Sequence, residues 1–165
     1  MTPNLPYRPN VGAVLFNRQG QVFLGRRSDI TDRDVWQLPQ GGIDAGEDPA
    51  IAVLRELREE IGTGDATILG SHPGPLTYDL PPELLGIAWR GEFRGQTQQW
   101  FALVLNADDS AIDLAAHGTP EFNAWRWAEL HELAELDVGF KRPIYQRLAV
   151  DFAPFRARLL GKPLE

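Results

Sequence analysis

One run of the sequence, GGIDAGEDPAIAVLRELREEIGT at residues 41–63, constrains the fold more than any other segment. Apolar and charged residues recur in it at spacings of three and four, which is typical of an amphipathic helix. Asp48 is placed to cap the first turn, and Pro49 fits that turn because its missing N–H needs no partner there. Gly62 can adopt the left-handed conformation that ends a helix. The run therefore predicts a helix at 49–61, entered through a glycine-rich loop.

Three carboxylates of this helix, Glu56, Glu59 and Glu60, fall on one stripe of its surface. Like charges at these spacings destabilise a bare helix by roughly a few tenths of a kcal/mol per pair. A hard divalent cation such as Mg²⁺ or Mn²⁺ would relieve the repulsion, since carboxylate oxygens suit such ions. A solvated acidic face is the alternative, and these residues alone do not separate the two interpretations. The apolar residues predicted on the opposite side are Ile51, Leu54, Leu57 and Ile61.

The composition indicates a single soluble domain. The chain has 165 residues and 43% hydrophobic content, enough for one core, so we expect one domain spanning residues 1–165. It has no cysteine, which excludes disulfides and a thiol nucleophile. The net charge of −7 argues against a protein that coats DNA or other nucleic acid through broad electrostatics. No apolar run approaches the length that spans a bilayer, so we expect no membrane partner and a cytoplasmic location.

The remaining segments alternate between short strands and helices. The apolar runs at 11–16 and 21–25 flank a four-residue turn and predict a β-hairpin. Further strands are predicted at 99–105 and 120–127, helices near 128–136 and 142–151, and a proline-rich loop at 72–84. Strands mixed with a few helices predict an α/β fold, in which a mixed sheet carries helices on both faces.

Residues 41–62 also resemble the Nudix box, a pattern of glycine and charged residues at fixed spacing. The matching positions are Gly41, Glu47, Arg55, Glu56, Leu57, Glu59, Glu60 and Gly62. Thr63 is the one departure, because the pattern has an aliphatic residue there, and we expect only a local packing change. So many spaced positions make this match far more specific than a short glycine motif. The resemblance implies a Nudix-type α/β/α sandwich with a mixed β-sheet and its box at 41–63.

The resemblance extends to blocks that span nearly the whole chain. These blocks look like the Nudix subgroup of RNA 5′ pyrophosphohydrolases and diadenosine tetraphosphate hydrolases. They are YRPNVGAV at 7–14, WQLPQGGID at 36–44, GQTQQWF at 95–101, TPEFNAWRW at 119–127 and VGFKRPIY at 138–145. The subgroup implies an enzyme that cleaves a phosphoric anhydride by attack of water on phosphorus. It also implies Mg²⁺ or Mn²⁺ as cofactor, with more than one ion per site.

Roles for the carboxylates and for one arginine follow from the same resemblance. The implied metal ligands are Gly41 through its carbonyl oxygen, Glu56, Glu59, Glu60 and Glu121. Glu56 is also the implied general base. Glu121 matches a position where the RNA pyrophosphohydrolases supply a further carboxylate, and an exposed acid at a strand start is the alternative. Arg55 is the other implied catalytic residue, because its planar fork can orient two box carboxylates at once.

Substrate contacts are implied by the subgroup blocks. The matching positions are Arg8, Arg27 and Lys141 for phosphates and Val138 and Phe140 for a nucleobase, with Tyr78 of the proline-rich loop as a further candidate. Stacking of Phe140 on a base would contribute roughly 1 to 3 kcal/mol. Burial of Phe140 in the core is the alternative, and surface solubility is the alternative for each basic residue taken singly.

Three functions are compatible with the sequence. The first is release of pyrophosphate from RNA 5′-triphosphate ends, which the base-contacting positions Val138 and Phe140 favour. The second is asymmetric hydrolysis of diadenosine tetraphosphate and other dinucleoside polyphosphates. The third is a non-catalytic nucleotide-binding regulatory module, which the intact carboxylates Glu56, Glu59 and Glu60 disfavour. The expected partner is therefore a nucleoside polyphosphate or a 5′-phosphorylated RNA.

Overall fold

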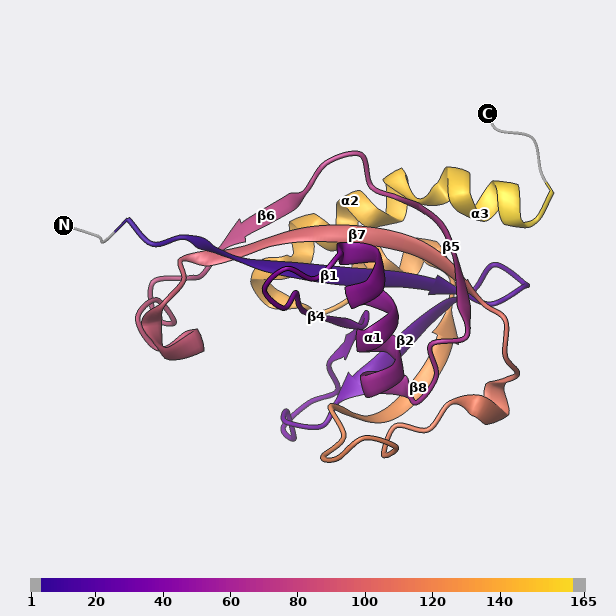
Figure 1. Ribbon diagram of the computed structural model, residues 1–165, viewed down its shortest axis with the longest axis horizontal. Helices are drawn as coiled ribbons and strands as arrows, with labels where there is room; N and C mark the ends of the chain where they lie inside the picture. Colours follow the sequence, from indigo (N-terminus) through magenta and orange to yellow (C-terminus); the bar gives the residue numbers. More distant parts are fainter. Residues whose placement is uncertain (1–3, 162–165) are drawn as a thin grey trace.

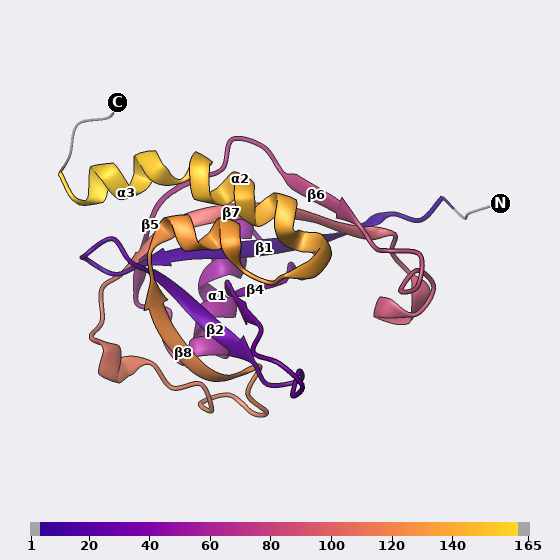
Figure 2. The same ribbon diagram turned by 180° about the vertical axis from the view of Figure 1, so that it is seen from behind.

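The computed structural model describes residues 4–161 and contains one mixed β-sheet with helices on both faces (Figure 1, Figure 2). Its strands are β1 (Tyr7–Phe16), β2 (Val22–Arg27), β3 (Trp36–Gln37), β4 (Gln40–Gly42), β5 (Ala66–Ser71), β6 (Leu76–Asp79), β7 (Gly95–Leu105) and β8 (Phe122–Ala128). The α-helices are α1 (Pro49–Ile61), α2 (Arg142–Asp151) and α3 (Ala153–Leu159). Short 3₁₀ segments are η1 (Ala88–Gly91), η2 (Asp109–Ala111), η3 (Leu130–Glu135) and η4 (Gly139–Lys141). The α/β class with a mixed sheet is confirmed.

A long parallel pairing between β1 and β7 forms the centre of the sheet. Ten residue pairs join the two strands, from Tyr7 opposite Gly95 to Phe16 opposite Val104. The other pairings are antiparallel. Strand β1 meets β2 where Phe16 lies opposite Val22, whereas the middle of β1 pairs with β4. Strands β1 and β2 therefore diverge from the hairpin turn, and β4 leads the chain from the sheet into α1.

Helix α1 confirms the predicted bounds and caps. The Asp48 side chain accepts a hydrogen bond from the Ala50 N–H, and Pro49 occupies the first turn. Gly62 ends the helix in the left-handed region with φ of 85°. A Cβ at this position would lie 2.5 Å from the carbonyl oxygen of Asp113, so glycine is required there for both backbone conformation and space.

One residue of α1 differs from the prediction. Ile51 was expected on the buried side, but 62% of its surface is exposed, so that expectation is wrong. The buried stripe runs through Val53, Leu57 and Ile61 and also takes in Glu60. Position 51 lies about 200° around the helix from position 53, which turns its side chain away from the sheet.

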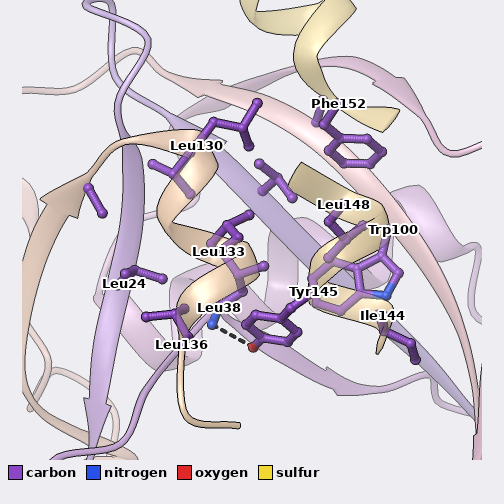
Figure 3. Packing of buried hydrophobic residues seen from close by; sticks show 14 of the residues in the cluster. Leu24, Leu38, Trp100, Leu130, Leu133, Leu136, Ile144, Tyr145, Leu148 and Phe152 are labelled. Atoms are coloured by element: carbon purple, nitrogen blue, oxygen red, sulfur yellow. Dashed lines mark hydrogen bonds between the residues drawn. The ribbon is translucent and has the colours of Figure 1, made fainter. Parts of the chain in front are cut away.

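One core lies between the sheet and α1. The face of the sheet opposite α1 is covered by η3, α2 and α3, and a second core lies beneath them (Figure 3). Trp100 of β7 is 1% exposed and meets Tyr145 of α2 edge-on, with ring centroids 6.2 Å apart. The Tyr145 hydroxyl accepts a hydrogen bond of 2.9 Å from the Leu38 N–H (Figure 3). This bond ties α2 to the segment between β3 and β4, which leads directly into the glycine-rich loop.

Most other predicted elements are confirmed with shifted ends. The hairpin at 11–16 and 21–25 is formed by β1 and β2, and the predicted strand at 99–105 begins earlier, at residue 95. The extended segment at 120–127 is β8, and the predicted helix at 142–151 is α2. Within residues 4–161, no helix is long and apolar enough to cross a membrane.

One expectation is wrong, and several short elements were not foreseen. The segment at 72–84 contains strand β6, which pairs with the start of β7. Its prolines lie outside Leu76–Asp79, so they bound the strand without interrupting it. The helical stretch predicted near 128–136 is present as the 3₁₀ helix η3. Strand β5 and helix α3 are only six and seven residues long, which is too short for a clear periodic signal.

The Tyr145 hydroxyl provides a test of how the two cores are joined. Tyr145→Phe would leave the buried Leu38 N–H without an acceptor, at a cost of roughly 1 to 3 kcal/mol in the free energy of unfolding. Denaturant unfolding measures this difference. Tyr7→Phe, at the half-buried start of β1, is the matched control: it removes a hydroxyl bonded to Asp79, whose side chain is 56% exposed, so water can replace the lost partner and the midpoint should change much less. Equal stability of Tyr145→Phe and wild type would contradict the proposed anchoring.

Candidate active site

Arg55 organises the box by bridging its glycine-rich loop and its helix. The guanidinium holds Glu47 through two hydrogen bonds, each of 2.8 Å, and donates a third of 2.9 Å to the Gly42 carbonyl oxygen. Two parallel bonds to one carboxylate match the planar fork of arginine, which lysine does not reproduce. The Arg55 side chain beside Glu47 lowers the pKa of that carboxyl to about 2. The loop is therefore fixed to α1 by a charged pair at neutral pH.

The same arginine also reaches the helix carboxylates. Its Nη1 donates to Glu56 at 2.9 Å and to Glu59 at 3.2 Å. The Glu59 side chain is 50% exposed, whereas that of Glu56 is 13% exposed. The expectation that Arg55 lies beside the box carboxylates matches this geometry, with Glu47 as its strongest partner.

Glu60 is the most deeply buried carboxylate of the cluster, with 5% of its surface exposed. Burial raises its pKa well above the ordinary value, and the nearby charges of Glu121 and Glu56 raise it further. A backbone hydrogen bond from Gln40 acts in the opposite direction. Burial also raises the pKa of Glu56, although Arg55 partly opposes the shift. Glu56, Glu60 and Glu121 thus share one region of concentrated negative charge.

Gly41 brings the backbone of β4 directly against these carboxylates. A Cβ built at this position would overlap the carboxyl group of Glu56. Any residue with a side chain would therefore displace Glu56 or push β4 away from α1. The glycine at this box position is required for the close approach, and its carbonyl lies on the same short strand as Gln40, the backbone partner of Glu60.

The donor chemistry of this region fits a hard divalent cation. Within residues 4–161, no three carboxylate or imidazole groups converge closely enough to form a complete metal-binding cluster by themselves. Mg²⁺ rarely uses a full protein cage, because it retains waters and binds through one or two carboxylates together with substrate phosphates. The neighbouring carboxylates Glu56 and Glu60 meet that requirement. Burial raises the pKa of both carboxyls, and for Glu56 the ion pair with Arg55 only partly opposes the shift, so a bound cation would stabilise their charged forms.

A cleft of about 810 Å³ opens beside the acidic cluster. Glu121 and Gln40 line it, so the cleft and the carboxylates share a boundary. The backbone at Glu121 is fixed by Ser28, whose N–H donates to the Glu121 carbonyl at 2.9 Å. The volume lies within the range of small-molecule binding sites and is large enough for more than one nucleoside.

Most of the predicted substrate residues come together in this cleft. The five that line it are Arg27, Tyr78, Val138, Phe140 and Lys141. Phe140 is 41% exposed, so its interpretation as a core residue is excluded. Its ring contacts Tyr78 with centroids 5.3 Å apart. Burial and the nearby Arg27 lower the pKa of Lys141 to about 8. The Lys141 ammonium also lies close enough to Glu60 and Glu121 to feel their charge.

Arg8 occupies a different position from these five. It is not one of the described residues that line the cleft; its guanidinium donates to Gln96 at 2.8 Å and lies 5.5 Å from the ring centre of Trp89. A Cβ on Gly42 would overlap the same guanidinium. Arg8 therefore connects the glycine-rich loop to the wall of the cleft that Trp89 forms.

The polar and aromatic cleft residues that sequence reasoning missed include Gln37, Gln40, Trp89 and Gln96. A signal existed for the glutamines. Positions 96, 98 and 100 lie on one face of β7, and glutamine at the first two breaks the apolar pattern expected over a core. The Gln98 amide bonds to both Asn10 and Gln40, so polar side chains form the floor beneath the cleft. Trp89 carried no such signal.

The raised pKa of Glu60 makes the stability of the metal-free protein depend on pH. A carboxyl whose pKa is raised on folding stabilises the folded state while protonated, and this contribution is lost as the pH rises through the folded-state pKa. The amide introduced by Glu60→Gln carries no charge at any pH. In EDTA we expect the variant to match wild type below the ordinary pKa of 4.5 and to become progressively more stable than wild type above it.

Thermal unfolding at several pH values measures this difference. Glu59→Gln, on the same helix but 50% exposed in its side chain, is the matched control and should show no such trend. A Glu60→Gln midpoint that follows wild type over the whole pH range would mean that Glu60 carries no burial penalty.

Comparison with known proteins gives the family. The model of the NUDIX domain matches residues 6–148. The chain is 58% identical over 158 residues to a Gluconacetobacter diazotrophicus protein named RNA pyrophosphohydrolase, which covers 92% of this chain and 95% of that one. A Rhodospirillum rubrum protein of the same name is 53% identical over 152 residues, which covers 92% of this chain and 90% of that one.

Solved structures share the fold at lower identity. A Caenorhabditis elegans Ap4A hydrolase in a binary complex superposes with a TM-score of 0.64 at 22% identity, covering 92% of this chain and 98% of that one. The Escherichia coli dihydroneopterin triphosphate pyrophosphohydrolase gives 0.66 at 20% identity, covering 88% and 98%. Because the domain model spans most of the sequence and relatives exceed half identity over nearly all of it, the chain belongs to the Nudix family.

Proposed function

We propose that this protein hydrolyses the 5′-triphosphate end of RNA and releases pyrophosphate. The observation that carries the proposal is a cleft that is lined by Lys141, Arg27 and the exposed ring of Phe140. Glu121, which also lines it, lies beside the buried Glu60 of the box. A triphosphate needs cationic side chains, and the base next to it needs an aromatic surface close by. The name RNA pyrophosphohydrolase of the relatives at 58% and 53% identity supports the same substrate.

The acidic cluster is the proposed metal site. Nudix hydrolases generally use divalent metal ions, and we propose Mg²⁺ or Mn²⁺, with more than one ion per site. The residues that would hold them are the Gly41 carbonyl, Glu56, Glu59, Glu60 and Glu121. When bound, such ions neutralise phosphate charge and lower the pKa of water. The Glu56–Glu60 pair suits this role because the two carboxyls lie close together and burial raises the pKa of each.

The side chains divide the remaining chemistry among them. Glu56 is the proposed general base, because its raised pKa increases its affinity for the proton that the attacking water loses. Arg55 is placed to position Glu56 while it holds the loop through Glu47. Lys141 and Arg27 would meet the phosphates. Arg27 already pairs with Asp29 through its Nε at 3.0 Å, which fixes its direction along the cleft.

Base recognition is assigned to the aromatic and apolar residues of the cleft. Phe140 and Tyr78 offer the outer faces of two touching rings, and Val138 adds apolar contact. We assign Arg8 the role of supporting Gln96 and Trp89, two residues that line the cleft. Any contact of Arg8 with phosphate would be made beside these two residues. The whole chain, residues 1–165, is proposed to act as one domain. A cytoplasmic location follows from the proposed RNA substrate.

Dinucleoside polyphosphates are the alternative substrate. The exposed Phe140 ring is equally suited to an adenine, and the cleft is large enough for more than one nucleoside. A non-catalytic binding module is the weakest candidate, because it would not need the buried pair Glu56 and Glu60, which destabilises the folded chain at neutral pH.

Kinetics on two substrates test the proposal. With Mg²⁺ or Mn²⁺, kcat/KM should be higher for 5′-triphosphate RNA than for diadenosine tetraphosphate. Glu60→Gln should lower turnover of both by at least the 10² to 10³ or so that follows loss of an electrostatic catalytic group. A preference for diadenosine tetraphosphate would establish the alternative, and near-wild-type turnover of Glu60→Gln would remove Glu60 from the site.

The role of Phe140 is tested by truncation. Phe140→Ala should weaken RNA binding by roughly 1 to 3 kcal/mol, because one stacked base is lost, and a mononucleoside triphosphate should be affected far less. Parallel measurements of KM on both substrates give the comparison. Val150→Ala is the control, since Val150 is an exposed apolar residue of α2 at 71% exposure that does not line the cleft. An unchanged KM for RNA would refute base contact at Phe140.

A further inference from the structure

The segment that precedes β7 has an unusual backbone. Trp89 and Arg90 have φ of 51° and 60°, and they are the two non-glycine residues with positive φ in the described range 4–161. Gly86 and Gly91 on either side also have positive φ. The left-handed region is unfavourable for residues with a Cβ, and consecutive examples persist only where the surroundings impose them.

Core packing does not account for this conformation. No residue of η1 (Ala88–Gly91) is buried. The indole of Trp89 has two aromatic or cationic neighbours: Phe93, edge-on with centroids 6.3 Å apart, and the Arg8 guanidinium at 5.5 Å. Arg8 is itself fixed by Gln96. A surface turn thus holds a large aromatic ring in one orientation by means of a buttressed arginine.

That orientation makes the indole a wall of the cleft. Trp89 lines the cleft together with Leu80, Leu84 and Ala88, all from the segment between β6 and β7. The cleft therefore has two aromatic regions in different parts of the chain, Trp89 and the pair Tyr78–Phe140. The rings of the pair lie 5.3 Å apart at 47°, which leaves no room for a base between them without separation.

We propose that Trp89 is a second base-stacking platform, which holds a nucleotide of the RNA beyond the one that contacts Phe140. Proteins hold single-stranded RNA by stacking successive bases on separate aromatic side chains, and arginine beside the ring strengthens such a site. The cleft of about 810 Å³ exceeds the needs of one nucleotide. This assignment rests on the proposed RNA substrate and makes Trp89 a specificity-determining residue for the length of the RNA.

Three variants separate stacking from packing of the turn. Trp89→Ala removes the ring, Trp89→Leu keeps apolar bulk without a π-face, and Trp89→Phe restores a smaller ring. The substrates are GTP, a 5′-triphosphate RNA of several nucleotides and diadenosine tetraphosphate. We expect Trp89→Ala and Trp89→Leu to raise KM for the RNA by about 5- to 150-fold relative to their effect on KM for GTP, with a much smaller change in kcat. Phe should recover most of the loss.

The outcomes distinguish the two proposals. If wild type fails to hydrolyse the RNA, the proposed function is wrong and this assignment falls with it. If wild type hydrolyses the RNA and Trp89→Leu has an unchanged KM for it, the assignment of Trp89 alone is wrong. An equal loss on GTP and RNA, or a larger loss on diadenosine tetraphosphate than on RNA, would also overturn it.

Discussion

The site depends first on the guanidinium of Arg55. Within residues 4–161 it is the one positive group that touches Glu47, Glu56 and the Gly42 carbonyl, so it joins the glycine-rich loop to the helix that carries the carboxylates. Repulsion within the acidic stripe would otherwise favour separation of loop and helix, because like charges oppose close approach. The arginine pairs with Glu47 and Glu56, whereas Glu60 lies buried beside the like charges of Glu121 and Glu56. That division explains how one helix carries both a structural ion pair and a buried carboxylate with a raised pKa.

A second support reaches the site from the far side of the sheet. The Tyr145 hydroxyl fixes the Leu38 N–H, and two residues later Gln40 donates its backbone N–H to Glu60. The segment from β3 to β4 is therefore held by α2 on one face while it contacts α1 on the other. Side chains of the same segment, Gln37 and Gln40, face the cleft. Precise placement of the carboxylates thus depends on packing in a core that contains none of them.

Sequence reasoning succeeded where the determinants are local. The cap at Asp48 and the stop at Gly62 fix α1 within its own residues, so its bounds were predictable to the residue. It was less successful where a residue or strand far along the chain determines the local structure or the burial of a side chain. Strand β6 forms because β7 provides an edge, and Ile51 is exposed because the sheet meets a different stripe of α1. The spacing of the box indicated Glu60, but its burial beside Glu121 required the tertiary structure. Trp89 could not be found at all, since its orientation comes from Arg8 on another strand.

The parallel pairing of β1 and β7 also determines the order in which the molecule can be completed. Arg8 and Gln96, joined by a hydrogen bond across β1 and β7, lie 88 residues apart in sequence. Closing so long a loop must precede any gain from the pairing, which slows folding of topologies of this kind. During synthesis the N-terminal part is available first. A growing chain therefore exposes the whole acidic box, helix included, well before the strand that completes the sheet has been made, and the catalytic surface is a product of the last stage of assembly.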